Sequence, residues 1–280
     1  MRSCVTKVSA GMEVQTNTDR VRQARRINME LMLAGHPKDC FVCDRNQTCD
    51  LRKLAYDMGI RDVRFPKATD VLLPLDTTSA SLVRDPNKCI LCRRCISVCA
   101  RVQSVHAIDT IHRGKGARVA TFMDEGLAST DCINCGQCLL VCPTGAITEA
   151  SAIDGVWKAL ADKSRVVLVE TAPAVRAAIG EEFGMPSGSL ATGKMAAALR
   201  RLGFAKVFDT QFSADLTILE EGHELIERIK NKGTLPMVTS CSPGWIKFAE
   251  HFFPKILDHL STCKSPQQMF GALAKTYYAQ

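Results

Sequence analysis

Eight cysteines between residues 89 and 142 form two copies of one spacing, C-x2-C-x2-C-x3-C. In a C-x2-C turn, successive thiolates can converge on one small metal core, whereas the x3 step directs the next sulfur outward. This spacing is typical of proteins that hold two [4Fe–4S] clusters, in which the fourth cysteine of each copy ligates the other cluster. The sequence therefore predicts one cluster on Cys89, Cys92, Cys95 and Cys142, and another on Cys132, Cys135, Cys138 and Cys99.

A further group of metal-ligand residues lies upstream and comprises His36, Cys40, Cys43 and Cys49, the His/Cys3 array. These ligand types can hold a zinc ion, or a [4Fe–4S] cluster with one imidazole ligand. Because the array precedes a two-cluster module (residues 89–142), we favour a third cluster. A neutral imidazole in place of a thiolate makes the site less negative, which should raise its reduction potential.

The 280-residue chain contains 14 cysteines and has a formal charge of +7 at pH 7. Eleven cluster thiolates and three cores of about +2 each would bring that charge to roughly +2, so the basic balance mostly offsets cluster charge. No arginine-rich tail or basic patch with interleaved aromatic residues indicates a nucleic-acid partner. The composition therefore gives no reason to expect nucleic-acid binding.

The sequence predicts a cytoplasmic protein without a membrane span. No apolar run approaches the roughly 18 residues that a membrane helix needs. Residues 1–14 lack the apolar core of a signal peptide. Thiols that are kept for metal also favour a reducing compartment.

The predicted elements place the cysteines in loops between short helices and strands. A helix should begin at Asn17 or Thr18, which can both cap it, and Gly35 should take the left-handed position just past its end. A short helix is expected over 51–60 and a connector over 61–86. The expected strands are 107–112, 118–122, 165–170, 206–209 and 235–239. The expected later helices are 193–202, 214–231, 243–260 and 266–279, and their alternation with strands predicts an α/β layer with a small parallel sheet.

Three features of the chain occur together in one known family: the segment HPKDC at 36–40, the two-cluster module, and the segment TSCSPGW at 239–245. Together they resemble the [FeFe]-hydrogenase catalytic subunit, over nearly the whole chain. The His/Cys3 array also resembles the large iron–sulfur subunit of respiratory NADH dehydrogenases, whereas the 235–270 region does not. The resemblance implies that the three clusters form an electron path.

Together with the predicted elements, the resemblance implies that the fold class is α+β and that the chain has several domains. A His-ligated [4Fe–4S] domain is expected over 1–70, a two-[4Fe–4S] ferredoxin-like domain over 71–155, and a partial α/β hydrogenase-like lobe over 156–280. This lobe should expose apolar surface at a subunit interface.

The chain departs from the family at the site that activates hydrogen. The family's motif has two adjacent cysteines, and the second, a ligand of the H-cluster, corresponds to Ser242 here. The family's other H-cluster cysteines lie in later motifs that this sequence does not contain. We therefore expect no H-cluster and no hydrogen turnover by this chain alone.

Cys4 matches the last ligand of the family's N-terminal [2Fe–2S] domain, and its three partners are absent from the sequence. We therefore expect no complete [2Fe–2S] site. Cys4 is interpreted as an unliganded thiol, and ligation shared with another chain is the alternative.

The family's proton path matches Cys241, Glu221, Glu224 and Ser261. Without a metal centre to supply, we interpret these residues as a small buried thiol, two carboxylates on one helix face, and a serine at a helix start. Cys263 is interpreted as a core thiol. No catalytic residue is therefore predicted.

The sequence predicts an electron-transfer subunit that relays electrons through three [4Fe–4S] clusters within an NAD(P)- and ferredoxin-linked oxidoreductase complex, with electron bifurcation. The resemblance implies a flavin- and NAD(P)-binding subunit, a further iron–sulfur subunit and ferredoxin as partners, with a formate dehydrogenase or similar catalytic subunit. Two alternatives stay open, a fragment of a working [FeFe]-hydrogenase and a redox-sensing iron–sulfur protein.

Overall fold

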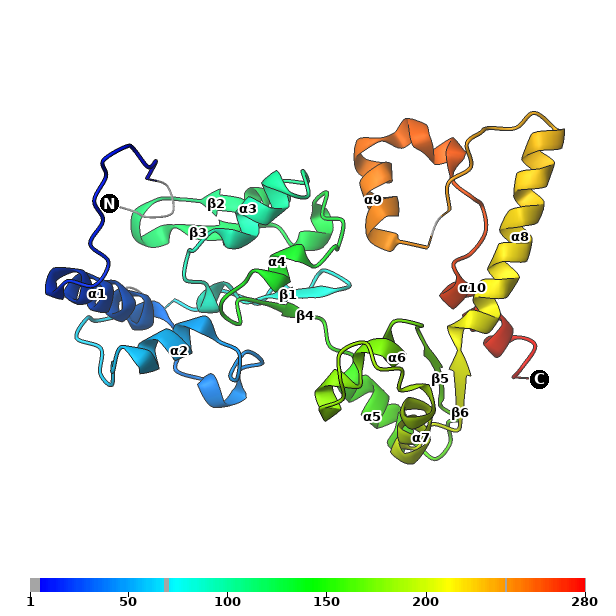
Figure 1. The fold of residues 1–280 in the computed structure, drawn as a ribbon, viewed down its shortest axis with the longest axis horizontal. Coiled ribbons are helices and arrows are strands. Elements are labelled where there is room, and N and C mark those ends of the chain that lie inside the picture. The colour runs from blue at the N-terminus through cyan, green and yellow to red at the C-terminus, as the bar shows by residue number, and fades with distance from the viewer. Residues whose placement is uncertain (1–5, 68–70, 240, 280) are drawn as a thin grey trace. The chain divides into compact units, whose positions relative to one another are not determined.

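The computed structural model describes residues 6–67, 71–239 and 241–279, and mixes helices with small two-stranded sheets (Figure 1). It divides into two compact units. The first comprises Met1–Cys132 and Gly136–Ala150, and the second comprises Ile133–Cys135 and Ser151–Gln280. Cys4 lies outside the described residues.

Among its described residues, the first unit contains four α-helices and two antiparallel strand pairs. The helices are α1 (Asp19–Gly35), α2 (Asp50–Asp57), α3 (Arg94–Arg101) and α4 (Gln137–Leu140). The strand pairs are β1 (Leu82–Arg84) with β4 (Ile147–Glu149), and β2 (Asp109–Ile111) with β3 (Arg118–Ala120). Short 3-10 helices cover Cys40–Val42, Pro86–Lys88, Gly114–Gly116, Phe122–Asp124 and Leu127–Ser129. The strands predicted at 107–112 and 118–122 are thus confirmed as β2 and β3.

Helix α1 begins as the sequence predicts and ends differently. Thr18 caps it, because its hydroxyl accepts a hydrogen bond from the Val21 N–H at 3.3 Å. The prediction that Gly35 takes a left-handed conformation is wrong. Gly35 stays within the helix, and His36 follows as an extended C-cap whose N–H bonds to the Leu33 carbonyl. The helix therefore ends without needing a left-handed residue.

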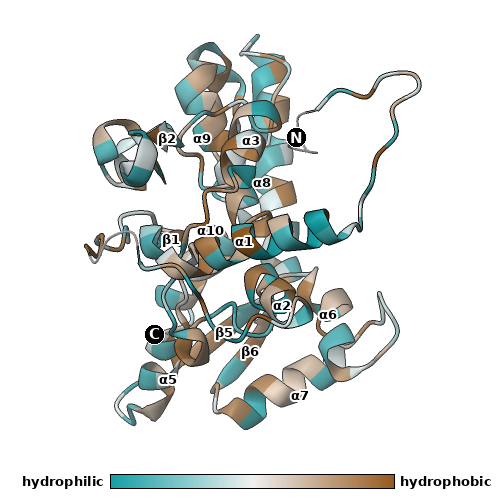
Figure 2. Cartoon of the chain, turned by 90° about the vertical axis from the view of Figure 1, so that its left-hand side faces the viewer, coloured by the Kyte–Doolittle hydropathy of each residue, from teal (hydrophilic) through white to brown (hydrophobic). Residues whose placement is uncertain are grey.

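One end of α1 carries the small core that supports the His/Cys3 array. Figure 2 shows α1 as mainly hydrophilic near its start, and Met29 near its other end packs with Leu51 and Ile60. Cys49 packs against this core. The fully buried Glu30 carboxylate forms ion pairs with two arginines, at 3.1 Å to Arg26 and 2.7 Å to Arg64.

A separate core supports the two-cluster module. Five buried side chains form it, namely Leu82, Cys95, Ile108, Leu127 and Ile147. Four further cysteines pack against this core, namely Cys99, Cys132, Cys138 and Cys142. The thiols of the module are therefore positioned by the same apolar residues that hold its strands and helices together.

The second unit surrounds a short parallel sheet of β5 (Leu168–Thr171) and β6 (Lys206–Asp209). Its α-helices are α5 (Ile153–Ala161), α6 (Val175–Ala178), α7 (Thr192–Leu202), α8 (Thr210–Lys230), α9 (Pro243–Phe252) and α10 (Pro266–Lys275). Short 3-10 helices cover Glu181–Phe183 and Pro254–His259. None of the helices in the described part of the chain is long and apolar enough to cross a membrane.

Prolines explain two differences from the predicted elements of this unit. The strand expected at 235–239 is wrong, since only Val238 forms an isolated bridge, to Leu260. Pro236 has no N–H to donate to a strand ladder. The single helix expected at 243–260 is also wrong, because Pro254 disfavours a helical conformation at Phe253, and a 3-10 helix follows.

Candidate metal centres

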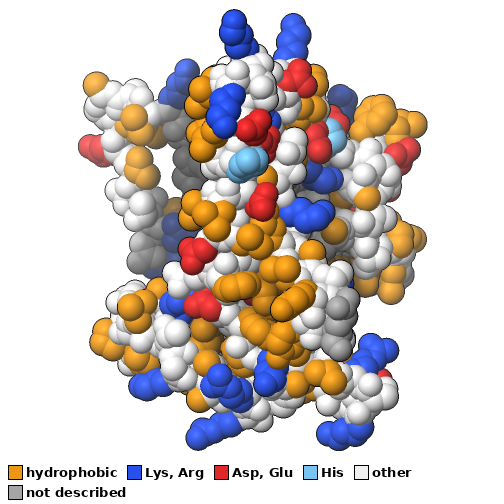
Figure 3. Space-filling view, turned by 90° about the vertical axis from the view of Figure 1, so that its right-hand side faces the viewer, with side chains coloured by type: hydrophobic (Ala, Val, Ile, Leu, Met, Phe, Trp, Pro, Cys, Tyr) orange, Lys and Arg blue, Asp and Glu red, His pale blue; other side chains and the backbone are white. Residues whose placement is uncertain are grey.

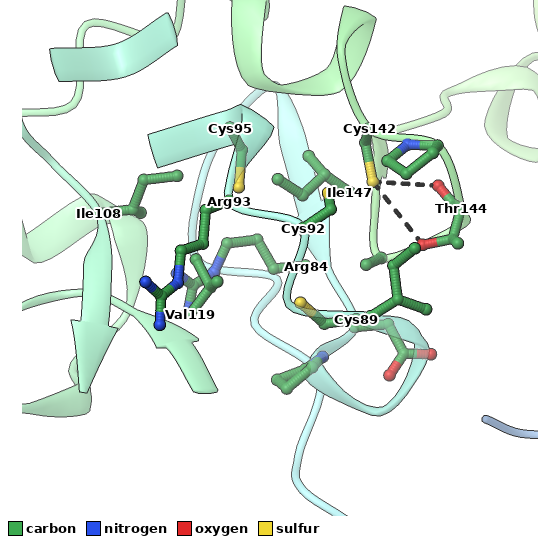
Figure 4. Close-up of a pocket in the computed structure, with 15 residues that line it drawn as sticks. Arg84, Cys89, Cys92, Arg93, Cys95, Ile108, Val119, Cys142, Thr144 and Ile147 are labelled. Carbon is green, nitrogen blue, oxygen red and sulfur yellow. Dashed lines mark hydrogen bonds between the residues drawn. The ribbon is translucent and has the colours of Figure 1, made fainter. Parts of the chain in front are cut away.

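Four thiols of the first unit line one cavity, and Figure 4 shows their sulfur atoms facing a common space. They belong to Cys89, Cys92, Cys95 and Cys142. The first two lie in the loop before α3, Cys95 lies in the first turn of α3, and Cys142 lies before β4. Apolar side chains of Ile108, Val119 and Ile147 complete much of the lining. The structure thus brings together all the ligands predicted for this cluster.

The loop that carries these thiols has an unusual backbone. Leu91 and Arg93, on either side of Cys92, have φ values of 56° and 60°. Left-handed conformations are uncommon for residues other than glycine and are associated with functional sites. Successive N–H groups in such turns form anion-binding concavities that occur at iron–sulfur sites. One of these groups, the Leu91 N–H, already donates to Cys89 Sγ at 3.4 Å.

The second cysteine run repeats this backbone. Asn134 and Gly136 flank Cys135 and have φ values of 55° and 73°. Cys99, Cys132 and Cys138 pack against the core of the first unit, whereas the exposed Cys135 belongs with the second unit. The ligand set predicted for the second cluster therefore stays a prediction from spacing, supported by the repeated loop conformation.

The chemistry of the four thiols in the cavity suits a metal cluster. Burial, with Cys89 and Cys92 nearby, raises the pKa of Cys95 to about 12. Burial also raises the pKa of Cys89. These thiols are therefore protonated at neutral pH in the absence of metal, and coordination to iron reverses this because a ligating thiol loses its proton. Loading of the site should release protons.

The structure brings three members of the His/Cys3 array around a second hollow, lined by His36, Cys40 and Cys49. His36 Nδ1 is buried and has no hydrogen-bond partner among the described residues. Burial lowers the pKa of His36, which favours the neutral imidazole that metals bind. In the described ranges, no three His, Cys, Asp or Glu side chains lie close enough to hold a single metal ion. An unpartnered, buried imidazole nitrogen in a hollow that two thiols also line fits a ligand role for a cluster larger than a single ion.

Cys43, the remaining member of the array, packs against the two-cluster module. A Cβ atom on Gly145 would lie only 2.9 Å from Cys43 Sγ. The negative charge that Cys43 carries when ionised also contributes to the raised pKa of Lys88, although burial of the lysine opposes it. This thiol therefore lies near Lys88, which directly precedes Cys89, and near Gly145, three residues after Cys142.

Hydrogen bonds hold the array on the module. The Asp50 N–H, directly after Cys49, donates to the Pro143 carbonyl, directly after Cys142, at 3.0 Å. Arg45 donates to the Leu139 carbonyl at 2.9 Å. Within the first unit, the two candidate sites are therefore joined through the residues that follow their last ligands.

Sequence reasoning missed three residues that shape these sites: Arg84, Lys88 and Gly145. A glycine two residues after Pro143 is a signal of close approach by another group, and this signal could have identified Gly145. Lys88 directly precedes Cys89, so its proximity to this cysteine follows from its position in the sequence alone. No sequence pattern indicates that Arg84 is buried.

The second unit contains most of the residues that match the hydrogenase proton path. Glu224 accepts hydrogen bonds from Arg228 at 2.6 Å, Ser261 Oγ at 2.9 Å and the Thr262 N–H at 3.0 Å. Burial opposes its ionisation, but these bonds outweigh burial and lower the pKa of Glu224. Burial and the adjacent Glu224 raise the pKa of Glu221. Glu224 thus links α8 to the segment before α10 as a fixed anion.

Two interpretations of this group need correction. Cys241 is exposed rather than buried, because it lies in the loop before α9. Ser261 is not at a helix start: it is buried beneath Glu224, and Ser265 caps α10 through a reciprocal bond with Gln268. Cys263 is partly buried, and its Sγ lies 3.6 Å from Glu224 Oε2.

Replacing Glu224 by glutamine should destabilise the second unit by about 2 kcal/mol at pH 7, the range for hydrogen bonds to charged groups. Because folding lowers the pKa of Glu224, its stabilisation is complete above the unfolded value of about 4.3 and is lost as pH falls through the folded value. Both tryptophans, Trp157 and Trp245, lie in this unit, so urea denaturation followed by tryptophan fluorescence measures it.

The control for this prediction is Glu227→Gln, which removes a carboxylate from the same helix. The side chain of Glu227 is 44% exposed and pairs with Lys230 at 3.6 Å, and it accepts a hydrogen bond from Asn231 Nδ2 at 3.1 Å. Surface pairs of this kind contribute at most about 1 kcal/mol. Equal effects of the two substitutions at pH 7 would contradict the structural role of Glu224.

Three protein families match successive parts of the chain. Residues 25–64 match the NADH-ubiquinone oxidoreductase-G iron-sulfur binding region, and residues 83–146 match a 4Fe-4S dicluster domain. Residues 165–280 match the C-terminal domain of the iron only hydrogenase large subunit. The chain is therefore an iron–sulfur protein with 4Fe–4S binding domains, and its C-terminal part is similar to the C-terminal domain of the iron only hydrogenase large subunit.

Individual relatives agree with this assignment. The chain is 52% identical over 99% of its length to the NADP-reducing hydrogenase subunit HndD of Solidesulfovibrio fructosivorans. It is 40% identical over 99% of its length to iron hydrogenase 1 of Clostridium pasteurianum. It spans about half the length of these curated relatives, 48% of each. A solved NAD+-reducing [NiFe]-hydrogenase contains a chain with a TM-score of 0.50 and 25% identity, over 54% of this chain and 64% of that one.

Proposed function

We propose that this chain is a cytoplasmic electron-transfer subunit that relays single electrons through three [4Fe–4S] clusters. One cluster would be held by Cys89, Cys92, Cys95 and Cys142, the second by Cys132, Cys135, Cys138 and Cys99, and the third by His36, Cys40, Cys43 and Cys49. The observation that carries the proposal is the convergence of four thiols on one apolar cavity beside a left-handed loop. When bound, the clusters supply one-electron chemistry, and the chain supplies ligands, spacing and shielding from water.

The packing of the His/Cys3 array on the two-cluster module supports a relay rather than two independent sites. Cys43 lies against Gly145, and the Asp50 N–H bonds to the Pro143 carbonyl. These contacts keep the candidate sites close together and fix the backbone between them. A short and rigid path favours electron transfer from one site to the next.

The proposal assigns no hydrogen activation to the chain. Ser242 stands where the hydrogenase motif has a cysteine ligand. It occupies the N-cap position of α9, is exposed, and makes no side-chain capping bond. A hydroxyl is a poor substitute for thiolate as an iron ligand. Bond-making chemistry would therefore belong to other subunits.

We infer that these other subunits bind NAD(P) and flavin, provide further iron–sulfur clusters and ferredoxin contacts, and catalyse a reaction such as formate oxidation, with electron bifurcation as the overall process. The HndD relative is a subunit of an NADP-reducing enzyme. The second unit also has an apolar hollow lined by Phe208, Phe212, Phe270, Leu273, Ala274, Tyr277 and Tyr278. Figure 3 shows hydrophobic side chains gathered on the face that carries α8 and α10. Exposed apolar surface of this kind favours a protein interface.

The test is anaerobic purification of the tagged chain from its natural host, followed by electron paramagnetic resonance of its clusters. The proposal predicts that a flavoprotein copurifies and that NADH or NADPH reduces the clusters only when this flavoprotein is present. A chain that purifies alone and receives no electrons from NAD(P)H with added flavoprotein would contradict a relay and favour a redox sensor. Hydrogen evolution by the isolated chain would favour a hydrogenase fragment instead.

A further inference from the structure

Arg84 is a buried cation at the wall of the cavity that Cys89, Cys92, Cys95 and Cys142 line. The residue ends β1, and only 7% of its surface is exposed. A buried charge normally requires a partner that offsets its loss of hydration. The groups around Arg84 therefore indicate which negative partner its guanidinium has.

Asp76 holds Arg84 in place but does not satisfy all its donors. The two backbones exchange hydrogen bonds at 2.9 and 3.0 Å, and Asp76 Oδ2 lies 3.1 Å from Arg84 Nε in an ion pair. Despite this ion pair, neither Nε nor Nη1 of Arg84 has a hydrogen-bond partner among the described residues. Two buried donor nitrogens, Nε and Nη1, thus remain without an acceptor at the wall of the thiol cavity.

Asp76 is itself committed to other donors. Its carboxylate accepts bonds from the Thr78 hydroxyl at 2.6 Å, the Thr78 N–H at 3.1 Å and the Leu127 N–H at 3.1 Å. The aspartate therefore fixes the loop around Arg84 and leaves part of the guanidinium without an acceptor. Buried polar groups are nearly always satisfied, so an orphaned pair of donors calls for a specific acceptor.

The two cysteine runs differ at this position. Arg84 lies five residues before Cys89, the first cysteine of the first run. Leu127 lies five residues before Cys132, the first cysteine of the second run, and both side chains are buried. A guanidinium is thus provided for one of the two ferredoxin-like sites. Net charge and hydrogen bonds to sulfur are among the factors that set cluster potentials.

We propose that Arg84 donates N–H···S hydrogen bonds to the cluster at Cys89, Cys92, Cys95 and Cys142, and that its charge makes this cluster easier to reduce. One-electron reduction adds a negative charge, and a buried cation stabilises the reduced form more than the oxidised form. Arg84 is therefore a tuning residue rather than a ligand. This inference rests on the cluster assignment in the proposed function.

The test is a redox titration of the full reconstituted chain with dithionite as reductant, monitored by electron paramagnetic resonance. Arg84→Met removes the charge and both donors at similar volume. The expected result is at least a tenfold fall in the equilibrium constant for reduction of this cluster, a midpoint about 59 mV or more lower for a one-electron couple. Arg84→Lys keeps the charge without the fork and should show a smaller shift.

Arg84→Met leaves the Asp76 carboxylate without its cation, which could destabilise the first unit. A second variant therefore also removes the charge of Asp76. Arg84→Met combined with Asp76→Asn keeps an acceptor for the Thr78 and Leu127 N–H groups, and it should show the same downward shift. Arg113→Met removes an exposed arginine from the same unit and should leave the potential unchanged. The signal is assigned to its site by its absence after Cys92 and Cys95 are both replaced by alanine.

The outcomes separate this inference from the proposed function. A fully occupied cluster with an unchanged potential in both Arg84→Met variants would overturn the role of Arg84 alone. If the wild-type chain shows no signal that depends on Cys92 and Cys95, the cluster assignment itself fails. A loss of stability without a shift in potential would show that Arg84 is only structural.

Discussion

Replacement of Cys92 and Cys95 by alanine is expected to lower the iron content of the anaerobically reconstituted chain from about twelve to about eight atoms. Both thiols line the cavity beside α3, and Cys95 also belongs to the buried core of the module. Loss of two of four ligands should prevent assembly of this cluster and leave the other two in place. Iron and acid-labile sulfide analysis measures the loss, and electron paramagnetic resonance identifies the missing signal.

The matched control is Cys241→Ala, which removes an exposed thiol of the second unit that is no proposed ligand. Its iron content should equal that of the unmodified chain. If the double variant also keeps all its iron, the cavity is not a cluster site, and the assignment from spacing is wrong.

The second large effect is expected from Gly145→Ala. The new methyl group would lie 2.9 Å from Cys43 Sγ, so one of the two must move. Gly145 lies in the buried segment 143–147, which is held by bonds from Asp50 to Pro143 and from Thr144 to the Lys88 carbonyl. Cys43 should therefore be displaced. We expect loss of the His36-ligated cluster, about four irons, with the signals of the two-cluster module retained.

Overpacking of this kind also costs about 1–3 kcal/mol of stability, so the control must separate iron loss from general destabilisation. Gly155→Ala places the same methyl group in α5, where nothing lies within 4 Å. It should leave the iron content unchanged. A complete set of three cluster signals in Gly145→Ala would show that contact with Gly145 does not determine the position of Cys43.

Ligand spacing predicted the cavity because it is local information. The distances among Cys89, Cys92 and Cys95 follow from one loop and one helical turn, and the structure gathers these thiols together with Cys142. Strands β2 and β3 were also predictable, since β-branched residues flank a glycine-rich turn. The short strand β6 was found at its predicted residues 206–209.

What the sequence could not predict depends on tertiary contacts. Arginine is usually a surface residue, and Arg84 is buried only because β1 pairs with β4 and with Asp76. The approach of Cys43 to Gly145 joins residues about a hundred positions apart. Ser261 was misplaced at a helix start because its burial depends on Glu224, which lies on another helix. Such contacts leave no periodic pattern in the sequence.

The most direct test of the relay is a count of metals in the chain after anaerobic purification. Three [4Fe–4S] clusters require about twelve irons and as many acid-labile sulfides per chain, and no zinc. About eight irons with one zinc would contradict this account, because the His/Cys3 array would then hold a structural ion that cannot carry electrons.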